Sequence, residues 1–206
     1  MLGLLAKKVG MTQVFDEAGN MMPVTVMRVD PNIVIAQKTE EKDGYNAVVV
    51  GVDDAKKSRV TKPYAGQFPE SIAPKKKLKE LRDFEKEVAV GDSLGVEVLE
   101  GVRYVDVSGV SKGKGFQGVV RRYGFGGGRK THGSKFHREP GSTGQATYPG
   151  KTFKNVKLPG RMGREKVTVL SLRVMKVDTE KQLILVKGSV PGVNKGLVLV
   201  RAAVKR

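Results

Sequence analysis

The sequence contains no cysteine in its 206 residues. Without cysteine the chain can form no disulfide, and it has no thiol nucleophile and no thiolate ligand for a structural zinc ion. This absence fits a reducing compartment. It excludes every class of enzyme or metal site that depends on sulfur from cysteine.

Long hydrophobic runs are also missing. No stretch of eighteen apolar residues occurs, and the start Met1–Lys8 has neither the basic leader nor the apolar length of a signal peptide. Hydrophobic residues make up 39% of the chain, which is enough for a globular core at this length. We therefore expect a cytosolic protein without a membrane partner, built as one large domain or two small ones.

Acidic residues are nearly absent from residues 108–166, which hold 14 Lys and Arg against 2 Asp and Glu. Residues 1–107 are balanced, with 16 basic and 17 acidic side chains, and residues 167–206 carry 8 against 2. Most of the net charge of +17 therefore lies in one segment, whose own net charge is +12. A clustered excess of this kind is typical of a protein that binds a polyanion, whereas a merely soluble basic protein spreads its charge.

Short runs with β character make up much of the remaining sequence. Gln13–Phe15 and Pro23–Val29 flank the turn cluster Asp16–Asn20, which predicts a hairpin. Leu78–Phe84 fits either a helical turn or an edge strand. Many short runs at a spacing of roughly ten residues favour a closed barrel or sandwich over a parallel α/β sheet. The other predicted strands are 32–36, 45–52, 94–99, 103–108, 167–174, 183–186 and 196–200.

The tract Tyr123–Gly163 interrupts these runs, because it has no apolar periodicity and contains ten glycines. Irregular segments of this length are usually functional or disordered. Glycine costs backbone entropy, and the scattered aromatic residues are too few to form a core that offsets it. We therefore expect a polyanionic partner to order the tract, since backbone without side chains can approach phosphates while Lys and Arg neutralise them. The predicted domains are a β-barrel (1–55, 88–122 and 164–206), an inserted subdomain (56–87) and an extended loop (123–163).

A nucleotide-binding motif is present only in part. Gly113–Gly118 spells G-x-G-x-x-G, but a dinucleotide site also needs a βαβ unit and an acidic residue about 20 positions on, and the nearest candidate, Glu139, lies in the glycine tract. Gly150–Thr152 resembles the end of a P-loop, but the required glycine is replaced by Gln145. A kinase has a similar glycine-rich loop, but the strand lysine motif, the catalytic loop and the metal-binding Asp-Phe-Gly of a kinase are missing. A nucleotide-binding enzyme therefore stays the alternative from another functional class, and calorimetric binding of ATP or NAD would support it.

Side chains for metal binding or catalysis are equally sparse. His132 and His137 are the only histidines, and they lie five residues apart with no carboxylate cluster nearby. Glu139 and Glu165 are isolated, so the basic segment contains neither paired carboxylates nor a nucleophile–base set. We therefore expect no enzyme activity, no metal, no cofactor and no small-molecule substrate.

RNA is the polyanion that this pattern favours. Aromatic residues interleaved with the basic ones supply faces on which unpaired bases stack, and no helix-turn-helix, zinc finger or basic zipper indicates DNA. A free RNA chaperone and a protein built into a large RNA particle both remain open at this point. The residues predicted to contact RNA are Lys112, Gly113, Lys114, Gly115, Arg121, Arg122, Arg129, Lys130, His132, Lys135, His137, Arg138, Lys151, Lys154, Lys157, Arg161 and Arg164.

One longer stretch resembles a known family. Asp106-Val-Ser-Gly-Val-Ser-Lys-Gly-Lys-Gly-Phe-Gln-Gly118, followed by Arg122, is similar to the signature of the large-subunit ribosomal protein family called L-three, in its bacterial form. The resemblance runs along the whole chain. Further similar stretches are Gly3–Gln13, Glu41–Ala47, Pro140–Gln145, Gly160–Gly163 and Val186–Gly192.

The resemblance implies a mainly β protein: a Greek-key β-barrel of the translation-protein type with an inserted small subdomain and a long, irregular, Gly-rich basic extension. It also implies a barrel that binds 23S rRNA near its 3′ end early in assembly, a loop that runs toward the peptidyl-transferase centre, and neighbours from the L-fourteen and L-nineteen families. Some bacterial members carry a methylated glutamine at the loop tip, and Thr147 at that position argues against this modification here. Carried over by position, the tip comprises Gly144, Gln145, Ala146, Thr147, Tyr148 and Pro149.

Overall fold

The structure is a computed structural model that describes residues 1–205. The chain divides into two compact units. The first, which we call the barrel unit, comprises Met1–Val110 and the residues from Lys166 onward. The second, the basic segment, comprises Ser111–Glu165. These limits lie within three residues of the charge boundaries seen in the sequence.

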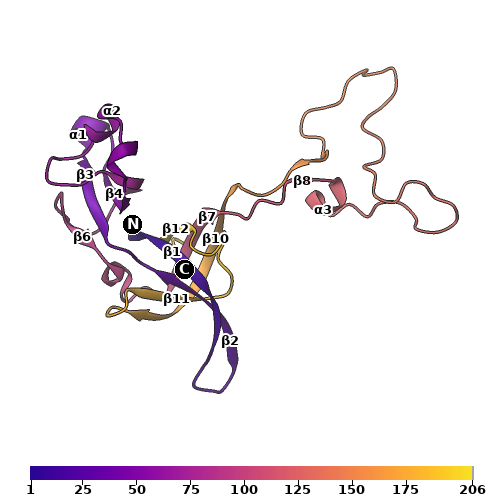
Figure 1. The fold of residues 1–206 in the computed structure, drawn as a ribbon. Coiled ribbons are helices and arrows are strands. Elements are labelled where there is room, and N and C mark those ends of the chain that lie inside the picture. The colour runs from indigo at the N-terminus through magenta and orange to yellow at the C-terminus, as the bar shows by residue number, and fades with distance from the viewer. Residues whose placement is uncertain (206) are drawn as a thin grey trace. The chain divides into compact units, whose positions relative to one another are not determined.

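The barrel unit contains a closed antiparallel barrel of six strands in the order β1-β12-β7-β10-β11-β2 (Figure 1). Strands far apart in the sequence are paired, so that Gly3 lies opposite Arg201 and Val107 lies opposite Val200. This barrel confirms the predicted mainly β fold, and β1 and β2 form the predicted hairpin around Asp16–Asn20. The barrel strands are β1 (Gly3–Phe15), β2 (Met21–Arg28), β7 (Tyr104–Val110), β10 (Lys166–Asp178), β11 (Leu183–Lys187) and β12 (Leu197–Ala202).

A second, four-stranded sheet in the order β5-β4-β3-β6 accompanies the barrel. Here the structure corrects the sequence prediction, which placed residues 32–54 in the barrel. The strands at these positions pair with each other and with a strand from the predicted insertion, because β4 has β3 on one side and β5 on the other. Leu78–Phe84, left open between helix and strand, lies mostly in β5. The strands are β3 (Asn32–Lys38), β4 (Ala47–Asp54), β5 (Lys75–Arg82) and β6 (Ser93–Leu94), and the short helices are α1 (Glu40–Asp43), η1 (Lys57–Arg59) and α2 (Lys62–Ala65).

The strand predicted at residues 94–99 is a second correction. Only Leu94 belongs to a strand, and Val96–Leu99 form the 3₁₀ helix η2. Its apolar side chains Val96, Val98 and Leu99 are all buried. A tight turn of this kind can bury three residues out of four, whereas a strand would point alternate residues to opposite faces. The Val96 N–H donates to Oε1 of Gln182 at 2.8 Å, which satisfies a backbone group at the start of the turn.

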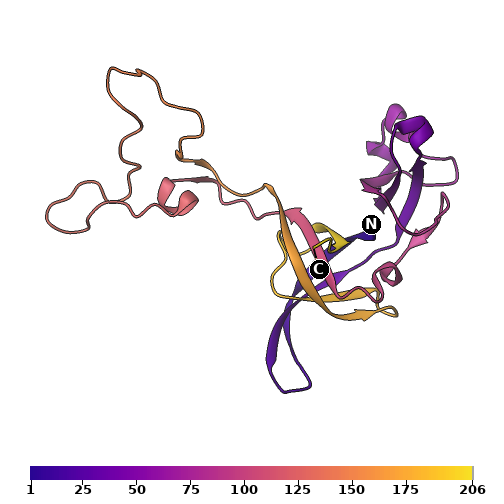
Figure 2. The same cartoon turned by 180° about the vertical axis from the view of Figure 1, so that it is seen from behind.

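The barrel and the second sheet share one hydrophobic core. Leu4 and Met27 from the barrel and Val34 and Val50 from the sheet all have no exposed surface. Because these residues belong to the same cluster, the two sheets stabilise one another and form a single cooperative body. Figure 2 shows this body from the opposite side.

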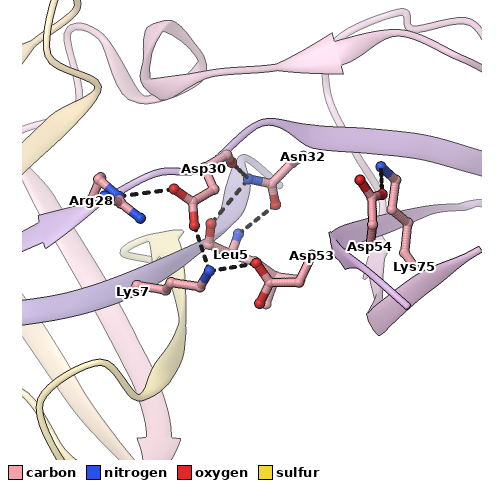
Figure 3. Close-up of polar contacts among 8 residues, drawn as sticks. All are labelled: Leu5, Lys7, Arg28, Asp30, Asn32, Asp53, Asp54 and Lys75. Carbon is pink, nitrogen blue, oxygen red and sulfur yellow. Dashed lines mark hydrogen bonds and ion pairs between the residues drawn. The ribbon is translucent and has the colours of Figure 1, made fainter. Parts of the chain in front are cut away.

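Polar contacts between β1 and the chain around β3 and β4 accompany this core (Figure 3). Asn32 is fully buried, and its amide both donates to the Leu5 carbonyl at 3.0 Å and accepts from the Leu5 N–H at 2.9 Å. The Lys7 Nζ lies 2.7 Å from an Asp30 carboxylate oxygen and also bonds Asp53. These two hydrogen bonds raise the pKa of Lys7. Burial pushes the pKa of Asp30 upward, but the contacts with Lys7 and Arg28 outweigh it and hold that pKa below its ordinary value.

The basic segment has little regular structure. It contains β8 (Phe116–Gln117), α3 (Val119–Tyr123) and β9 (Gly160–Arg161), and no helix or strand occurs at residues 124–159. Val119 is the one buried residue among residues 111–165. The segment therefore has no hydrophobic core, as its sequence predicts. No helix within residues 1–205 is long and apolar enough to cross a membrane.

Candidate RNA-binding surface

The two ends of the basic segment are joined by backbone hydrogen bonds. The Lys114 N–H donates to the Met162 carbonyl and the Met162 N–H donates to the Gly115 carbonyl, both at 2.9 Å. Phe116 lies opposite Arg161 in the β8–β9 pair. Gly163 has a φ of +76°, and a Cβ at this position would overlap the carbonyl oxygen of Lys112, so only glycine fits there. The sequence analysis did not find this pairing, because both partners are short and rich in glycine.

The glycine motif Gly113–Gly118 belongs to this paired region. Gly115 adopts a φ of +68° and Gly118 precedes the five-residue helix α3. All strand pairs within residues 1–205 are antiparallel, so the βαβ unit that a dinucleotide site requires does not occur in the described chain. The motif shapes a turn and a helix start here, and the structure gives the nucleotide-binding alternative no support.

Arg122 differs from the other predicted RNA contacts. Its side chain is half-buried, and its Nη1 donates to the Leu158 carbonyl at 2.9 Å. The guanidinium also lies 5.0 Å from the centre of the Tyr123 ring, a cation–π distance. A Cβ at Gly160 would contact the Arg122 guanidinium, so the glycine leaves room for it. Arg122 therefore connects α3 to the returning chain, a structural role that hydrogen-bonding partners reveal and composition does not.

The other twelve predicted Lys and Arg contacts are exposed. None of them forms an ion pair, because all eight ion pairs found in residues 1–205 lie within the barrel unit. Arg121 makes one weak bond, from Nη1 to the Gln117 side chain at 3.3 Å. A dense set of cations without internal counter-ions carries a strong positive potential, which attracts a polyanion. These residues are Lys112, Lys114, Arg121, Arg129, Lys130, Lys135, Arg138, Lys151, Lys154, Lys157, Arg161 and Arg164.

The two predicted histidines lie in one glycine-supported loop. The Gly128 N–H donates to the His137 carbonyl at 3.3 Å, and the His137 ring nitrogen Nδ1 lies 2.9 Å from the Arg129 carbonyl. A Cβ at Gly128 would overlap the Phe136 carbonyl, so the two chains of the loop approach closely only with glycine. His132 is exposed in the same loop. Within the described residues no group of three His, Asp or Glu side chains could hold a metal ion.

The predicted tip, residues 144–149, is uncharged and exposed apart from Pro149. Tyr148 is 91% exposed, more than any other large hydrophobic residue of the described chain. The Ser142 hydroxyl donates to the Gly144 carbonyl at 2.8 Å and shapes the turn before the tip. An aromatic ring with this exposure is available to stack on another flat group.

Comparison with known proteins identifies the family. The family described as ribosomal protein L3 matches residues 75–183, more than half of the chain. The large ribosomal subunit protein uL3 of Treponema denticola is 58% identical over 206 residues, covering 100% of this chain and 99% of that protein. The uL3 protein of Borrelia hermsii is 49% identical over 207 residues, with the same coverage. The chain belongs to the ribosomal protein L3 family.

Membership in the L3 family confirms the resemblance seen in the sequence. The family consists of structural ribosomal proteins rather than enzymes, and bacterial members reside in the cytoplasmic ribosome. The basic segment carries most of the signature residues, and the matched range 75–183 includes all of it.

Proposed function

We propose that this protein is a structural constituent of the large ribosomal subunit whose basic segment packs among 23S rRNA phosphates. The observation that carries this proposal is the set of twelve exposed basic side chains without a single ion pair. Phosphates of folded RNA would supply the missing counter-ions. The relatives are named large ribosomal subunit protein uL3, and the large ribosomal subunit is a particle that contains such RNA.

The barrel unit has a different part in this proposal. Its shared core makes it stable without RNA, so it can bind the 3′ region of 23S rRNA early in assembly, before the basic segment is ordered. The basic segment, which lacks a core, gains its order from the RNA around it. Exposed rings at Phe116, Phe136 and Phe153 provide surfaces on which unpaired bases stack.

The tip residues 144–149 are proposed to point toward the peptidyl-transferase centre. They carry no charge, so they suit close packing in a crowded RNA interior better than phosphate neutralisation. Thr147 lacks the amide that methylation of a glutamine would need, so the tip is proposed to be unmodified. Proteins of the L-fourteen and L-nineteen families are the proposed neighbours of the barrel unit.

The salt dependence of binding tests this proposal. If roughly ten phosphates are contacted, the slope of log affinity for 23S rRNA against log salt should lie at about −7 to −9. Filter binding of the full-length protein to purified 23S rRNA measures it, and a slope near −1 would exclude the proposed role of the basic segment. Sedimentation of cell extracts separates a ribosomal constituent from a free RNA chaperone: the former travels with the large subunit, and the latter stays in the free pool.

A further inference from the structure

A cleft of about 490 Å³ opens in the barrel unit, outside the basic segment. One wall is formed by residues 79–82 of β5 and by Asp83 directly after it, and the other by the barrel around Gly3, Ser108 and Arg201. Lys166, the first residue of β10, lies at its border. The cleft thus brings together cations at positions 79, 166 and 201, which are widely separated in the sequence.

Arg201 is the unusual residue of this cleft. Its Nε is buried and has no hydrogen-bond partner, the only such side-chain atom in the described chain. Buried guanidinium N–H groups nearly always have a partner, because leaving one unpaired costs about 1–3 kcal/mol or more. Asp106 lies opposite Arg201 in the strand register, but no ion pair joins them, and the Asp106 carboxylate accepts from the Ser171 N–H at 2.8 Å. The unpaired Nε is therefore a donor without an acceptor in the protein itself.

Gly3 makes this position of Arg201 possible. Gly3 lies directly opposite Arg201 on the neighbouring strand, and a Cβ at Gly3 would come 3.1 Å from the Arg201 Cγ. The φ of Gly3 is not in the left-handed region, so backbone conformation does not require glycine here. The missing side chain instead leaves space for the stem of Arg201 along the floor of the cleft.

Two lysines line the same cleft without counter-ions. Lys79 is half-buried and Lys166 is exposed, and neither forms an ion pair with any described residue. Of the acids in the cleft, Glu80 is already paired with Lys38 and Arg82. Asp83 is the one remaining carboxylate in the lining, so the three lining cations without an ion pair face a single unpaired acid.

We propose that this cleft binds a backbone phosphate of rRNA, as a second RNA contact separate from the basic segment. A phosphate in the cleft can accept from two guanidinium N–H groups of Arg201 at once, and the two lysines neutralise its charge. This inference rests on the proposed function, since it takes the RNA to be ribosomal. It adds that the barrel unit holds RNA through a defined anion site.

The experiment measures the salt slope of binding to purified 23S rRNA for the full-length protein and for a triple variant, Lys79→Gln, Lys166→Gln and Arg201→Gln. Each lost phosphate contact reduces the slope by about 0.7–0.9, so loss of the one proposed contact predicts a reduction of about 0.7–0.9 in the triple variant. Lys76→Gln is the control, because Lys76 is exposed on the same strand but does not line the cleft. An unchanged slope in the triple variant overturns the proposal. The slope would also stay unchanged if a carboxylate of a neighbouring protein, and not an RNA phosphate, occupied the cleft.

Two further variants keep the result interpretable. Lys166→Gln alone changes an exposed side chain, so it should fold even if loss of Arg201 disturbs the barrel, and it should still lower the slope, by at most about 0.7–0.9. The triple variant is also made in a protein without residues 125–160. If the cleft mutations lower the slope there while the deletion itself has no effect, the anion site stands and the proposed role of the basic segment fails. If only the deletion lowers the slope, the basic segment keeps its proposed role and the anion site is rejected.

Discussion

In the barrel unit Lys7, Lys38 and Lys75 each contact a carboxylate, whereas in the basic segment no lysine or arginine does. The barrel unit buries a shared core of aliphatic side chains, and residues 111–165 bury only Val119. The same chain therefore contains one region that satisfies its charges and apolar groups internally and one that leaves both to a partner. This difference indicates that the barrel unit folds by itself, and it supports the proposal that RNA orders the basic segment.

Removal of the basic segment should have the largest effect. Replacing residues 125–160 with a short Gly-Ser linker removes seven basic side chains, so the salt slope for 23S rRNA should shrink by about 5 to 6. Active large subunits should not form, yet the β-sheet signal in circular dichroism and the melting temperature should remain close to those of the full-length protein. The hydrophobic core lies outside the deletion, and an unfolded variant would therefore contradict the division into two units.

Truncation of an apolar side chain should lower the free energy of unfolding in the barrel unit but hardly change it in the basic segment. Leu4 has no exposed surface, so Leu4→Ala should lower the free energy of unfolding by about 2–5 kcal/mol. Phe153 in the basic segment is 56% exposed, so Phe153→Ala should change it by less than about 0.5 kcal/mol. Urea unfolding followed by circular dichroism measures both. A comparable loss in the two variants would mean that the basic segment contributes to the folded core.

The sequence revealed the broad fold because strand alternation and turn residues are local signals. It did not reveal which sheet each strand joins: the runs at 32–36 and 45–52 show the same half-buried pattern as barrel strands, but they pair with each other and with β6 and β5 in the second sheet. Pairing depends on partners that are distant in the sequence, and periodicity carries no information about them. Val96–Leu99 was mistaken for a strand because a short apolar run fits a buried turn equally well.

The candidate RNA-binding residues were likewise predicted only in part. Charge and glycine content located the basic segment, since both are properties of one continuous stretch. Arg122 was grouped with the phosphate contacts, because only the structure shows that it bonds the Leu158 carbonyl. Arg201 was missed altogether, because the residues around it meet through strand register rather than through neighbouring positions.

The ion pairs of the barrel unit offer the smallest and most specific test of the comparison. Lys7→Met removes the charge but keeps most of the aliphatic stem, and it leaves Asp30 and Asp53 without their common partner. About a quarter of the Lys7 and Asp30 side-chain surface is exposed, so solvent screening limits the expected loss of stability to about 1 kcal/mol at neutral pH. The matched control is Lys76→Met, which removes an exposed lysine without an ion pair and should be nearly neutral.

The pH dependence identifies the Lys7–Asp30 pair as the cause. The pKa of Asp30 is lowered in the folded protein, so its contribution is present above the ordinary carboxyl pKa of about 4 and is lost as the pH falls through the lower folded value. The pKa of Lys7 is raised, so its contribution is present below the ordinary value of 10.5 and is lost as the pH rises through the higher folded value. The stability difference between wild type and Lys7→Met should therefore be constant from about pH 5 to pH 10 and should shrink in acid. Urea unfolding at about pH 3 and pH 7 measures this, and an equal difference at both values would show that Lys7 acts through packing of its stem instead of through its charge.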